Sequence, residues 1–205
     1  MDIAGGCLST YASGVPRPPL TVWRWTRTEY DRLVDLGLFR GEPVELIGGE
    51  LLVAEPQGSY HANAVSVADD LLRGLLPAGW VVRSQMPVAL DEESEPEPDL
   101  AVIRGTRAEL WAAHPTLPAL VVEVADTSLA FDRDVKGSLY ARAGIADFWI
   151  VNLLDRVVEV RRDPAADATA RYGWRYGTVA VHGPLASIAL LALPEVRVPV
   201  RSLLP

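Results

Sequence analysis

The stretch Leu120-Val121-Val122-Glu123-Val124-Ala125 is the segment of the sequence that decides the fold. It has the length of a strand and is apolar at every position but one, which is typical of a central strand buried on both faces of a sheet. Glu123 is the only charged residue between Leu117 and Ala125. A carboxylate in such a strand is costly unless it is paired or bound to a metal ion. The segment therefore predicts a central strand that carries one acid with a special role.

The sequence around this segment predicts further strands and helices, and neither an internal repeat nor a clear linker interrupts it. We therefore expect one α+β domain with a mixed sheet over residues 21–205, after a flexible lead-in over residues 1–20 that is rich in Gly, Pro and Ser. Hydrophobic periodicity, capping boxes and turn residues place the expected elements. The expected helices cover 27–36, 61–76, 131–143 and a short segment around 110–111, and the expected strands cover 44–47, 50–53, 80–90, 99–103, 120–125, 148–153 and 156–161.

The composition excludes several classes of protein. With 49% hydrophobic and 22% charged residues, the 205-residue chain can bury a sizeable core, so it is not a disordered protein. Its single cysteine, Cys7, excludes a disulfide framework and a cysteine-based zinc site. No segment has the pattern of a signal peptide or the roughly 20 apolar residues of a membrane span. We expect a cytoplasmic protein with no membrane partner.

The negative charge of the chain is concentrated in one place. Six acids lie between Asp91 and Asp99 with no basic residue among them, and without them the formal net charge of −8 would be −2. Residues 91–97 are expected to form a solvated hairpin tip. Asp99 differs, because it follows Pro98 and opens the apolar run Leu100–Ile103, at the start of a strand.

Asp99 and Glu123 are expected to lie at adjacent strand ends. Together with a backbone carbonyl such as that of Val124, the two carboxylates would form an oxygen-rich site. Mg²⁺ suits such a site, because it takes only one or two protein carboxylates and keeps several waters. A metal ion there would stabilise charge on a phosphate and activate a water molecule.

The chain contains 18 arginines and a single lysine, Lys136. In the expected helix, Lys136 lies on the same face as Tyr140, so its ammonium group would reach the sheet end that carries Glu123. The alternative is an ordinary surface ion pair between Asp132 and Lys136, worth a few tenths of a kcal/mol. Arginine would serve that pair equally well, which favours a special role for this lysine.

These residues resemble the PD-(D/E)xK nuclease superfamily, whose signature is a Pro-Asp dipeptide followed by an acid-x-Lys motif. Over roughly residues 25–205, the chain also resembles a widespread bacterial family of restriction-endonuclease-like proteins of unknown biological role. The ordered residues that carry this resemblance are Val44-Glu45-Leu46-Ile47-Gly48-Gly49-Glu50, His61, Pro98-Asp99-Leu100, Val122-Glu123-Val124, Asp132, Lys136, Tyr140, Gly144 and Phe148-Trp149.

The resemblance implies a restriction-endonuclease-like fold, a mixed central sheet flanked by helices, and magnesium-dependent phosphodiester cleavage. Two positions depart from the pattern. Ala125 stands where the superfamily has its lysine, and the family places that lysine on the following helix, at Lys136 here. Asn152 stands where the family has an aspartate, and we expect this position to be structural.

Three further residues are candidates for the site. His61 opens a helix and would act as a base, a phosphate contact or an outer ligand, although such a histidine is often only partly exposed. Glu45 in the hairpin is favoured over Glu50 as an acid that points to the site, and solvated strand carboxylates are the alternative. Gln85 would contact a metal-bound water.

The sequence thus predicts a Mg²⁺- or Mn²⁺-dependent endonuclease that acts on DNA, with Asp99, Glu123, Lys136, His61 and Glu45 as catalytic residues and Asp99, Glu123 and the Val124 carbonyl as metal ligands. One alternative is a non-catalytic binding or assembly module with the same fold, and another is a nuclease that cleaves RNA or branched DNA. The acidic balance argues against broad affinity for nucleic acid. A basic rim from Arg104/Arg107, Arg161/Arg162 and Arg171/Arg175, and a homodimer, are further expectations.

Overall fold

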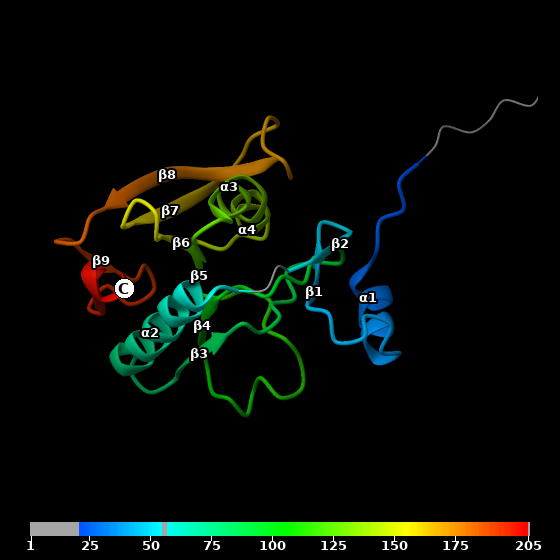
Figure 1. The fold of residues 1–205 in the computed structure, drawn as a ribbon, viewed down its shortest axis with the longest axis horizontal. Coiled ribbons are helices and arrows are strands. Elements are labelled where there is room, and N and C mark those ends of the chain that lie inside the picture. Colours follow the sequence, from blue (N-terminus) through cyan, green and yellow to red (C-terminus); the bar gives the residue numbers. More distant parts are fainter. Residues whose placement is uncertain (1–20, 55–56, 205) are drawn as a thin grey trace, which may run out of the picture.

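The fold is organised around a six-stranded sheet (Figure 1). The computed structural model describes residues 21–54 and 57–204. Every neighbouring pair of strands is antiparallel except β5 and β6, which run parallel, so the sheet is mixed as predicted. In sheet order, the strands are β3 (Trp80–Ser84), β4 (Leu100–Arg104), β5 (Leu120–Ala125), β6 (Asp147–Asn152), β7 (Val157–Ala166) and β8 (Trp174–His182).

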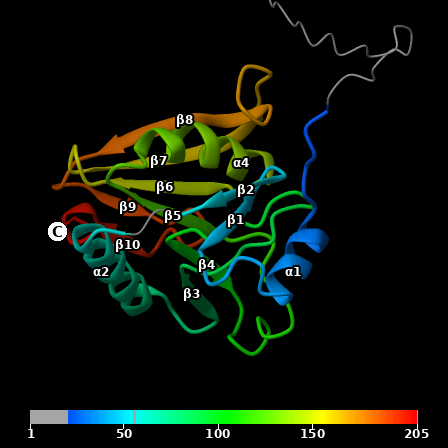
Figure 2. The ribbon, with the colours of Figure 1, turned by 45° about the vertical axis from the view of Figure 1, so that its right-hand side comes forward.

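Helices cover both faces of this sheet (Figure 2). Helix α2 (Ser59–Leu75) packs on one face together with the C-terminal segments, and α4 (Gly137–Arg142) packs on the other, against β7 and β8. The remaining elements are α1 (Arg27–Asp35), β1 (Val44–Ile47), β2 (Glu50–Val53), α3 (Leu129–Phe131), the π-helix η1 (Asp132–Lys136), β9 (Ser187–Ala189), β10 (Arg197–Pro199) and the 3₁₀-helix η2 (Val200–Ser202).

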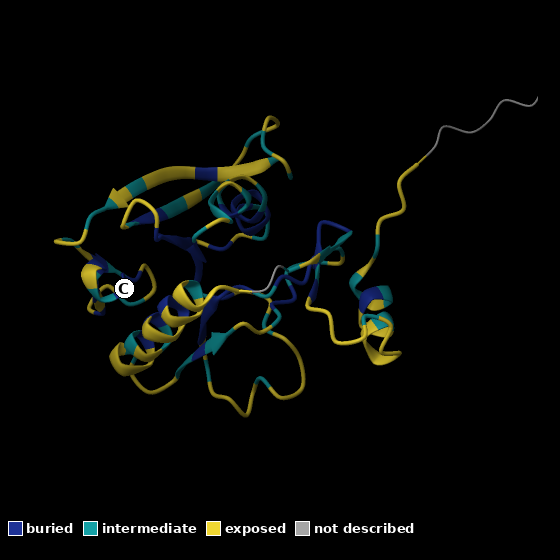
Figure 3. Ribbon diagram, in the orientation of Figure 1, coloured by how far each residue is buried: buried dark blue, intermediate teal, exposed yellow. Residues whose placement is uncertain are grey.

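Strand β5 lies at the centre of the core, and all six of its residues are buried (Figure 3). Val122 and Val124 pack on the α2 side, whereas Val121 and Ala125 pack on the α4 side. Because β5 and β6 are parallel, the chain must cross over between them, and α3, η1 and α4 form this crossover. The prediction of a two-sided buried strand is confirmed, and it places Glu123 inside the molecule.

Three predictions of local structure are also confirmed. Thr26 caps α1 and forms the expected capping box with Glu29. Gly48 and Gly49 join β1 to β2, and both have positive φ, as a two-residue hairpin turn requires. The helix expected over 61–76 runs from Ser59 to Leu75.

Two predicted elements are wrong in part or in full. The strand expected over 80–90 ends at Ser84, because Gln85 adopts a left-handed φ of 49° that a strand cannot continue through. The short helix expected around 110–111 is a series of turns, although the predicted capping contacts of Thr106 with Glu109 do form.

The acidic segment 91–97 is not a solvated hairpin tip, and this prediction is wrong. Its backbone docks on the hairpin, where the N–H of Glu95 donates to the carbonyl of Leu46 at 2.8 Å. Glu95 is only 3% exposed, and Asp91 forms an ion pair with Arg142 at 2.7 Å. Partners supplied by other segments of the chain allow these acids to pack.

The expected lead-in over residues 1–20 lies outside the described residues. No helix in the described part of the chain combines the length and the apolar character that a membrane crossing requires.

Candidate functional site

A cleft of about 900 Å³ lies between the β1–β2 hairpin, the start of α2, the ends of β4 and β5, and the crossover helices. Figure 2 shows how these elements, which are distant in the sequence, surround one end of the sheet. The cleft brings together all the residues that the sequence singled out for the site: Glu45, His61, Gln85, Asp99, Glu123, Val124 and Lys136.

Asp99 and Glu123 face each other across two adjacent strands. Leu100 pairs with Val122 in the β4–β5 register, so Asp99 lies one step beyond the last pair, opposite Glu123. The backbone N–H of Asp99 donates to Oε2 of Glu123 at 3.3 Å, and the N–H of Val124 donates to Oδ2 of Asp99 at 2.8 Å. Both carboxylates are buried, at 8% and 2% exposure. The strand register therefore fixes the spacing of the two acids.

His61 lies in the first turn of α2 and contacts the same strand ends as Asp99 and Glu123. Its Nε2 is 2.7 Å from the carbonyl oxygen of Val124 and 3.3 Å from Oδ2 of Asp99. Its Nδ1 is buried and has no hydrogen-bond partner among the described residues. The contact with Asp99 raises the pKa of the imidazole above its ordinary value, although burial opposes this shift. Nε2 therefore makes the contacts that orient this ring in the site.

Lys136 reaches the acids from the crossover. Its Nζ lies 3.0 Å from Oε1 of Glu123 and 3.8 Å from Oε2 of Glu45. Burial alone would lower the pKa of this ammonium group, but the negative charges of Glu123 and Glu45 raise it above its usual value. Lys136 is therefore a charged hydrogen-bond donor at neutral pH and not a proton acceptor. The interpretation of Lys136 as part of a surface ion pair is wrong, since Lys136 and Asp132 are both buried.

A π turn sets the position of Lys136, and no local sequence pattern indicates this turn. The segment expected as one helix over 131–143 is α-helical on both sides of η1, where the N–H of Gly137 donates to the carbonyl of Asp132, five residues back. In a regular α-helix, each step of four residues rotates the side-chain direction by about 40°. The wider π turn offsets this rotation and keeps Asp132, Lys136 and Tyr140 directed to one side. Such π turns are frequent at functional sites.

Sequence reasoning missed two members of the site. The hydroxyl of Tyr140 donates to Oε1 of Glu123 at 2.6 Å, and Asp132 accepts a hydrogen bond from Ser128 at 2.6 Å beside Lys136. Burial raises the pKa of Glu123, and Lys136 only partly offsets this shift. Burial likewise raises the pKa of Asp132 to about 6. The spacing of Asp132, Lys136 and Tyr140 at i, i+4 and i+8 was the available signal.

Glu45 and Gln85 hold the outer side of the cleft. Oε2 of Glu45 accepts the backbone N–H of Glu97 at 3.1 Å, so the hairpin is tied to the acidic segment at the site. The left-handed backbone of Gln85 brings its side-chain amide to Oδ1 of Asp99, at 3.4 Å. Glu50 lies outside the cleft, where it pairs with Arg171 at 3.3 Å. The preference for Glu45 over Glu50 thus agrees with the geometry.

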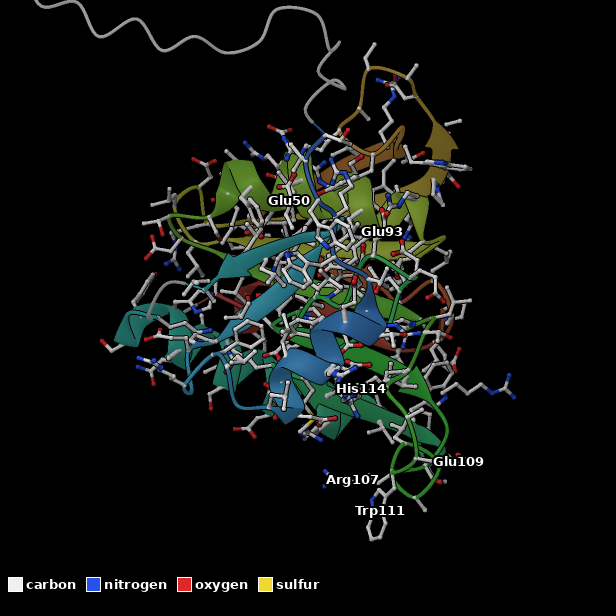
Figure 4. The ribbon with its side chains drawn as sticks, turned by 90° about the vertical axis from the view of Figure 1, so that its right-hand side faces the viewer. Glu50, Glu93, Arg107, Glu109, Trp111 and His114 are labelled. Atoms are coloured by element: carbon white, nitrogen blue, oxygen red, sulfur yellow. The ribbon has the colours of Figure 1, made fainter. Side chains whose placement is uncertain are left out.

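The arginines of the expected basic rim do not line the cleft, and in the described residues Lys136 is its only lysine or arginine. Figure 4 shows Arg107 and Trp111 at the outer end of the loop after β4, directed away from the body of the molecule. Arg161 is engaged with Glu159 at 2.7 Å, and Arg162 with Asp147 at 2.8 Å. The cleft itself is strongly acidic.

The donor atoms in the cleft fit a hard divalent cation. Asp99 Oδ2 and the Val124 carbonyl oxygen both lie close to His61 Nε2, and Oε2 of Glu123 accepts only a long hydrogen bond. No cluster of three or more His, Cys, Asp or Glu side chains arranged for a metal ion occurs among the described residues. Mg²⁺ and Mn²⁺ do not need one, because they bind through one or two carboxylates and keep waters. A cation bound beside Glu123 would offset the burial that disfavours its ionised form.

Comparisons with known proteins agree with this architecture. A family model described as "Uma2: Putative restriction endonuclease" matches residues 27–201. A solved structure from Anabaena variabilis ATCC 29413, described as a "putative nuclease belonging to DUF820", shares the fold with a TM-score of 0.57 and 14% sequence identity. The match covers 78% of this chain and 88% of that chain. No curated protein matches the sequence.

Proposed function

The chain belongs to the Uma2 family of restriction-endonuclease-like proteins, and on that premise we propose that it is a Mg²⁺- or Mn²⁺-dependent endonuclease that hydrolyses phosphodiester bonds in DNA. The observation that carries the proposal is the convergence of Asp99, Glu123 and Lys136 from two strands and a helix. Two acids and a buried ammonium group at one sheet end provide both a cation site and a positive charge for a phosphate.

We assign the metal ion to Asp99, Glu123 and the carbonyl of Val124, with His61 beside them. A divalent cation bound there would stabilise charge on the phosphate and lower the pKa of a water molecule. The carboxylate of Asp99 is held by the N–H of Val124, so its orientation is fixed before any cation binds. Preorganised ligands of this kind are typical of metal sites in which other protein groups orient the ligands.

Lys136 supplies the second function of the site. Because its ammonium group stays charged and lies 3.0 Å from Glu123, it is placed to donate a hydrogen bond to a phosphate oxygen or to the attacking water. The hydroxyl of Tyr140 donates to Oε1 of Glu123, the same oxygen that Lys136 contacts, and so holds this carboxylate beside the ammonium group. Nε2 of His61 contacts the Val124 carbonyl oxygen and Oδ2 of Asp99, so His61 would orient two of the assigned metal ligands. Positioned donors of this type contribute about 10²–10³-fold to the rate of many enzymes.

A cleavage assay on plasmid DNA with Mg²⁺ or Mn²⁺ tests the proposal. The variants Asp99→Asn and Glu123→Gln keep the size of each side chain, and we expect each to lose about 100-fold or more of the activity. Lys136→Ala should lose a similar amount. Glu50→Gln is the matched control, because Glu50 is a hairpin carboxylate outside the cleft, and it should retain full activity. Equal residual activity in all variants would contradict the proposal and indicate a contaminating nuclease.

The second candidate function is a non-catalytic binding or assembly module with the same fold. Calorimetric titration separates the two, because the nuclease requires Mn²⁺ binding that Asp99→Asn weakens, whereas the module does not. A homodimer and a cytoplasmic location stay predictions from the sequence.

A further inference from the structure

One part of the cleft wall is apolar, although the rest of the cleft is acidic. The apolar residues come from the hairpin region and from α3, which are far apart in the sequence, and they lie beside the carboxylates of the proposed site. They are Pro43, Ile47, Leu52, Val53, Ala54 and Phe131. Val53 is 62% exposed whereas Ile47 is only 1% exposed, so among the described residues the wall is open at its outer end and packed at its inner end.

Phe131 is the aromatic member of this wall. It directly precedes Asp132, is only half-buried, and lines the cleft. Among the described residues it belongs to none of the hydrophobic core clusters and contacts no other aromatic ring. Packing of the core therefore does not explain why an aromatic ring is held at this position.

The charges of the cleft restrict the kind of nucleic acid that it can accept. Duplex DNA is held largely through contacts of Lys and Arg with its backbone phosphates. The lining of the cleft offers only Lys136 for this purpose, and Lys136 already faces Glu123. Single strands also make backbone contacts, but their unpaired bases add stacking on aromatic side chains and apolar contact, which paired bases inside a duplex cannot make.

We infer that the cleft accepts an unpaired nucleotide whose base lies against Phe131 and the apolar wall of the hairpin, so that the preferred substrate is a single-stranded segment of DNA. This inference rests on the proposed nuclease function. A phosphodiester bound through a divalent cation at Asp99 and Glu123 must place its attached nucleosides against the walls of the same cleft. A cleft of about 900 Å³ is large enough for such a group. Phe131 is then a specificity-determining residue and not a catalytic one.

The first experiment measures binding of a short fluorescent DNA strand, alone and in duplex form, by anisotropy in the presence of Ca²⁺. We expect the single strand to bind more tightly than the duplex. Phe131→Ala should weaken binding of the single strand about five- to 100-fold, the range found when a stacking aromatic residue is removed. Phe131→Tyr should restore it. Trp111→Ala is the matched control, since Trp111 is 89% exposed on a distant loop, and it should bind as the wild type does.

The second experiment measures cleavage, with Mn²⁺, of a strand that carries one abasic position. Removal of the base should reduce local cleavage by the wild type but not further reduce that by Phe131→Ala, because the same contact is already lost. Tighter binding of the duplex, or unchanged binding of the strand by Phe131→Ala, would overturn the inference. Failure of the proposed function is distinguishable, because then the wild type cleaves no better than Lys136→Ala whatever the binding shows.

Discussion

Gly137 offers a direct test of the π turn, because it is the residue that closes this turn. Its N–H donates to the carbonyl of Asp132. A Cβ atom added at Gly137 would lie 3.2 Å from that carbonyl oxygen and 3.5 Å from Cε1 of Phe148. The first distance is shorter than ordinary van der Waals contact, so in Gly137→Ala the carbonyl must move by a few tenths of an ångström. Lys136 lies within the same turn and would move with it.

The expected effects on stability and activity differ, which makes the variant informative. Alanine favours a helix by about 1 kcal/mol relative to glycine, whereas crowding in a packed interior costs about 1–3 kcal/mol. The free energy of unfolding of Gly137→Ala should therefore fall by no more than about 2 kcal/mol. Activity is more sensitive, because a displacement of 1 Å at a catalytic group can cost about 100-fold. A shift of a few tenths of an ångström at Lys136 should reduce kcat about tenfold.

The assay compares kcat for DNA cleavage with the Tm of each variant. Gly74→Ala in α2 is the matched control, because nothing lies within 4 Å of the added Cβ and the backbone is helical. This control should gain up to about 1 kcal/mol of stability and keep the wild-type kcat. If Gly137→Ala also keeps the wild-type kcat, the π turn does not determine the position of Lys136.

Three further predictions concern single side chains. Lys136→Arg keeps the charge but places a larger planar group in a buried position, so steady-state cleavage should fall at least about tenfold. Full activity of this variant would contradict a specific catalytic role for the lysine. Burial raises the pKa of Glu95 to about 6 in the folded state, so the stability that its protonated form provides is complete below the unfolded pKa of about 4.5 and is lost as the pH rises through 6. Urea denaturation should therefore show Glu95→Gln to be more stable than the wild type by about 2 kcal/mol near pH 8 and equal to it near pH 4, and an equal difference at both pH values would contradict this. Glu159→Ala should lower the free energy of unfolding by about 3–5 kcal/mol, because it leaves Arg133 and Arg161 without their buried partner. Arg133→Ala should lower it less, because Arg161 still pairs with Glu159. Equal losses of stability in thermal denaturation would refute this difference.

The sequence was sufficient to predict those features that depend on local pattern. An apolar six-residue run with one acid identified β5, and Gly48-Gly49 identified the hairpin, because both signals reside in adjacent residues. The pairing of Asp99 with Glu123 followed from their positions at the ends of two buried strands. These inferences succeed because few other structures bury a short apolar run on both sides or join two strands through two consecutive glycines.

Other features depend on contacts between distant segments and could not be predicted. The burial of Glu95 requires the backbone of Leu46, which lies 49 positions earlier in the chain, to accept its N–H. The left-handed conformation of Gln85 is unusual for a residue other than glycine, so no local pattern indicates it. The π turn lies in a segment whose sequence is compatible with a regular helix, so local pattern does not indicate it.

The single lysine of the chain has a physical explanation in the structure. Arg133 donates three hydrogen bonds to Glu159, from Nε to both carboxylate oxygens and from Nη2 to Oε1, a fork-like arrangement that the planar guanidinium group favours. Lys136 instead lies between carboxylates from two different elements, Glu45 and Glu123, in a space that leaves it 8% exposed. A guanidinium group there would bring five N–H donors, and those left without acceptors in the buried space would each be costly. The compact ammonium group has three donors that can point to separate acceptors. Among the described residues, arginine is therefore acceptable where a carboxylate can accept from its planar group, and lysine suits position 136, where a compact cation lies buried between two acids.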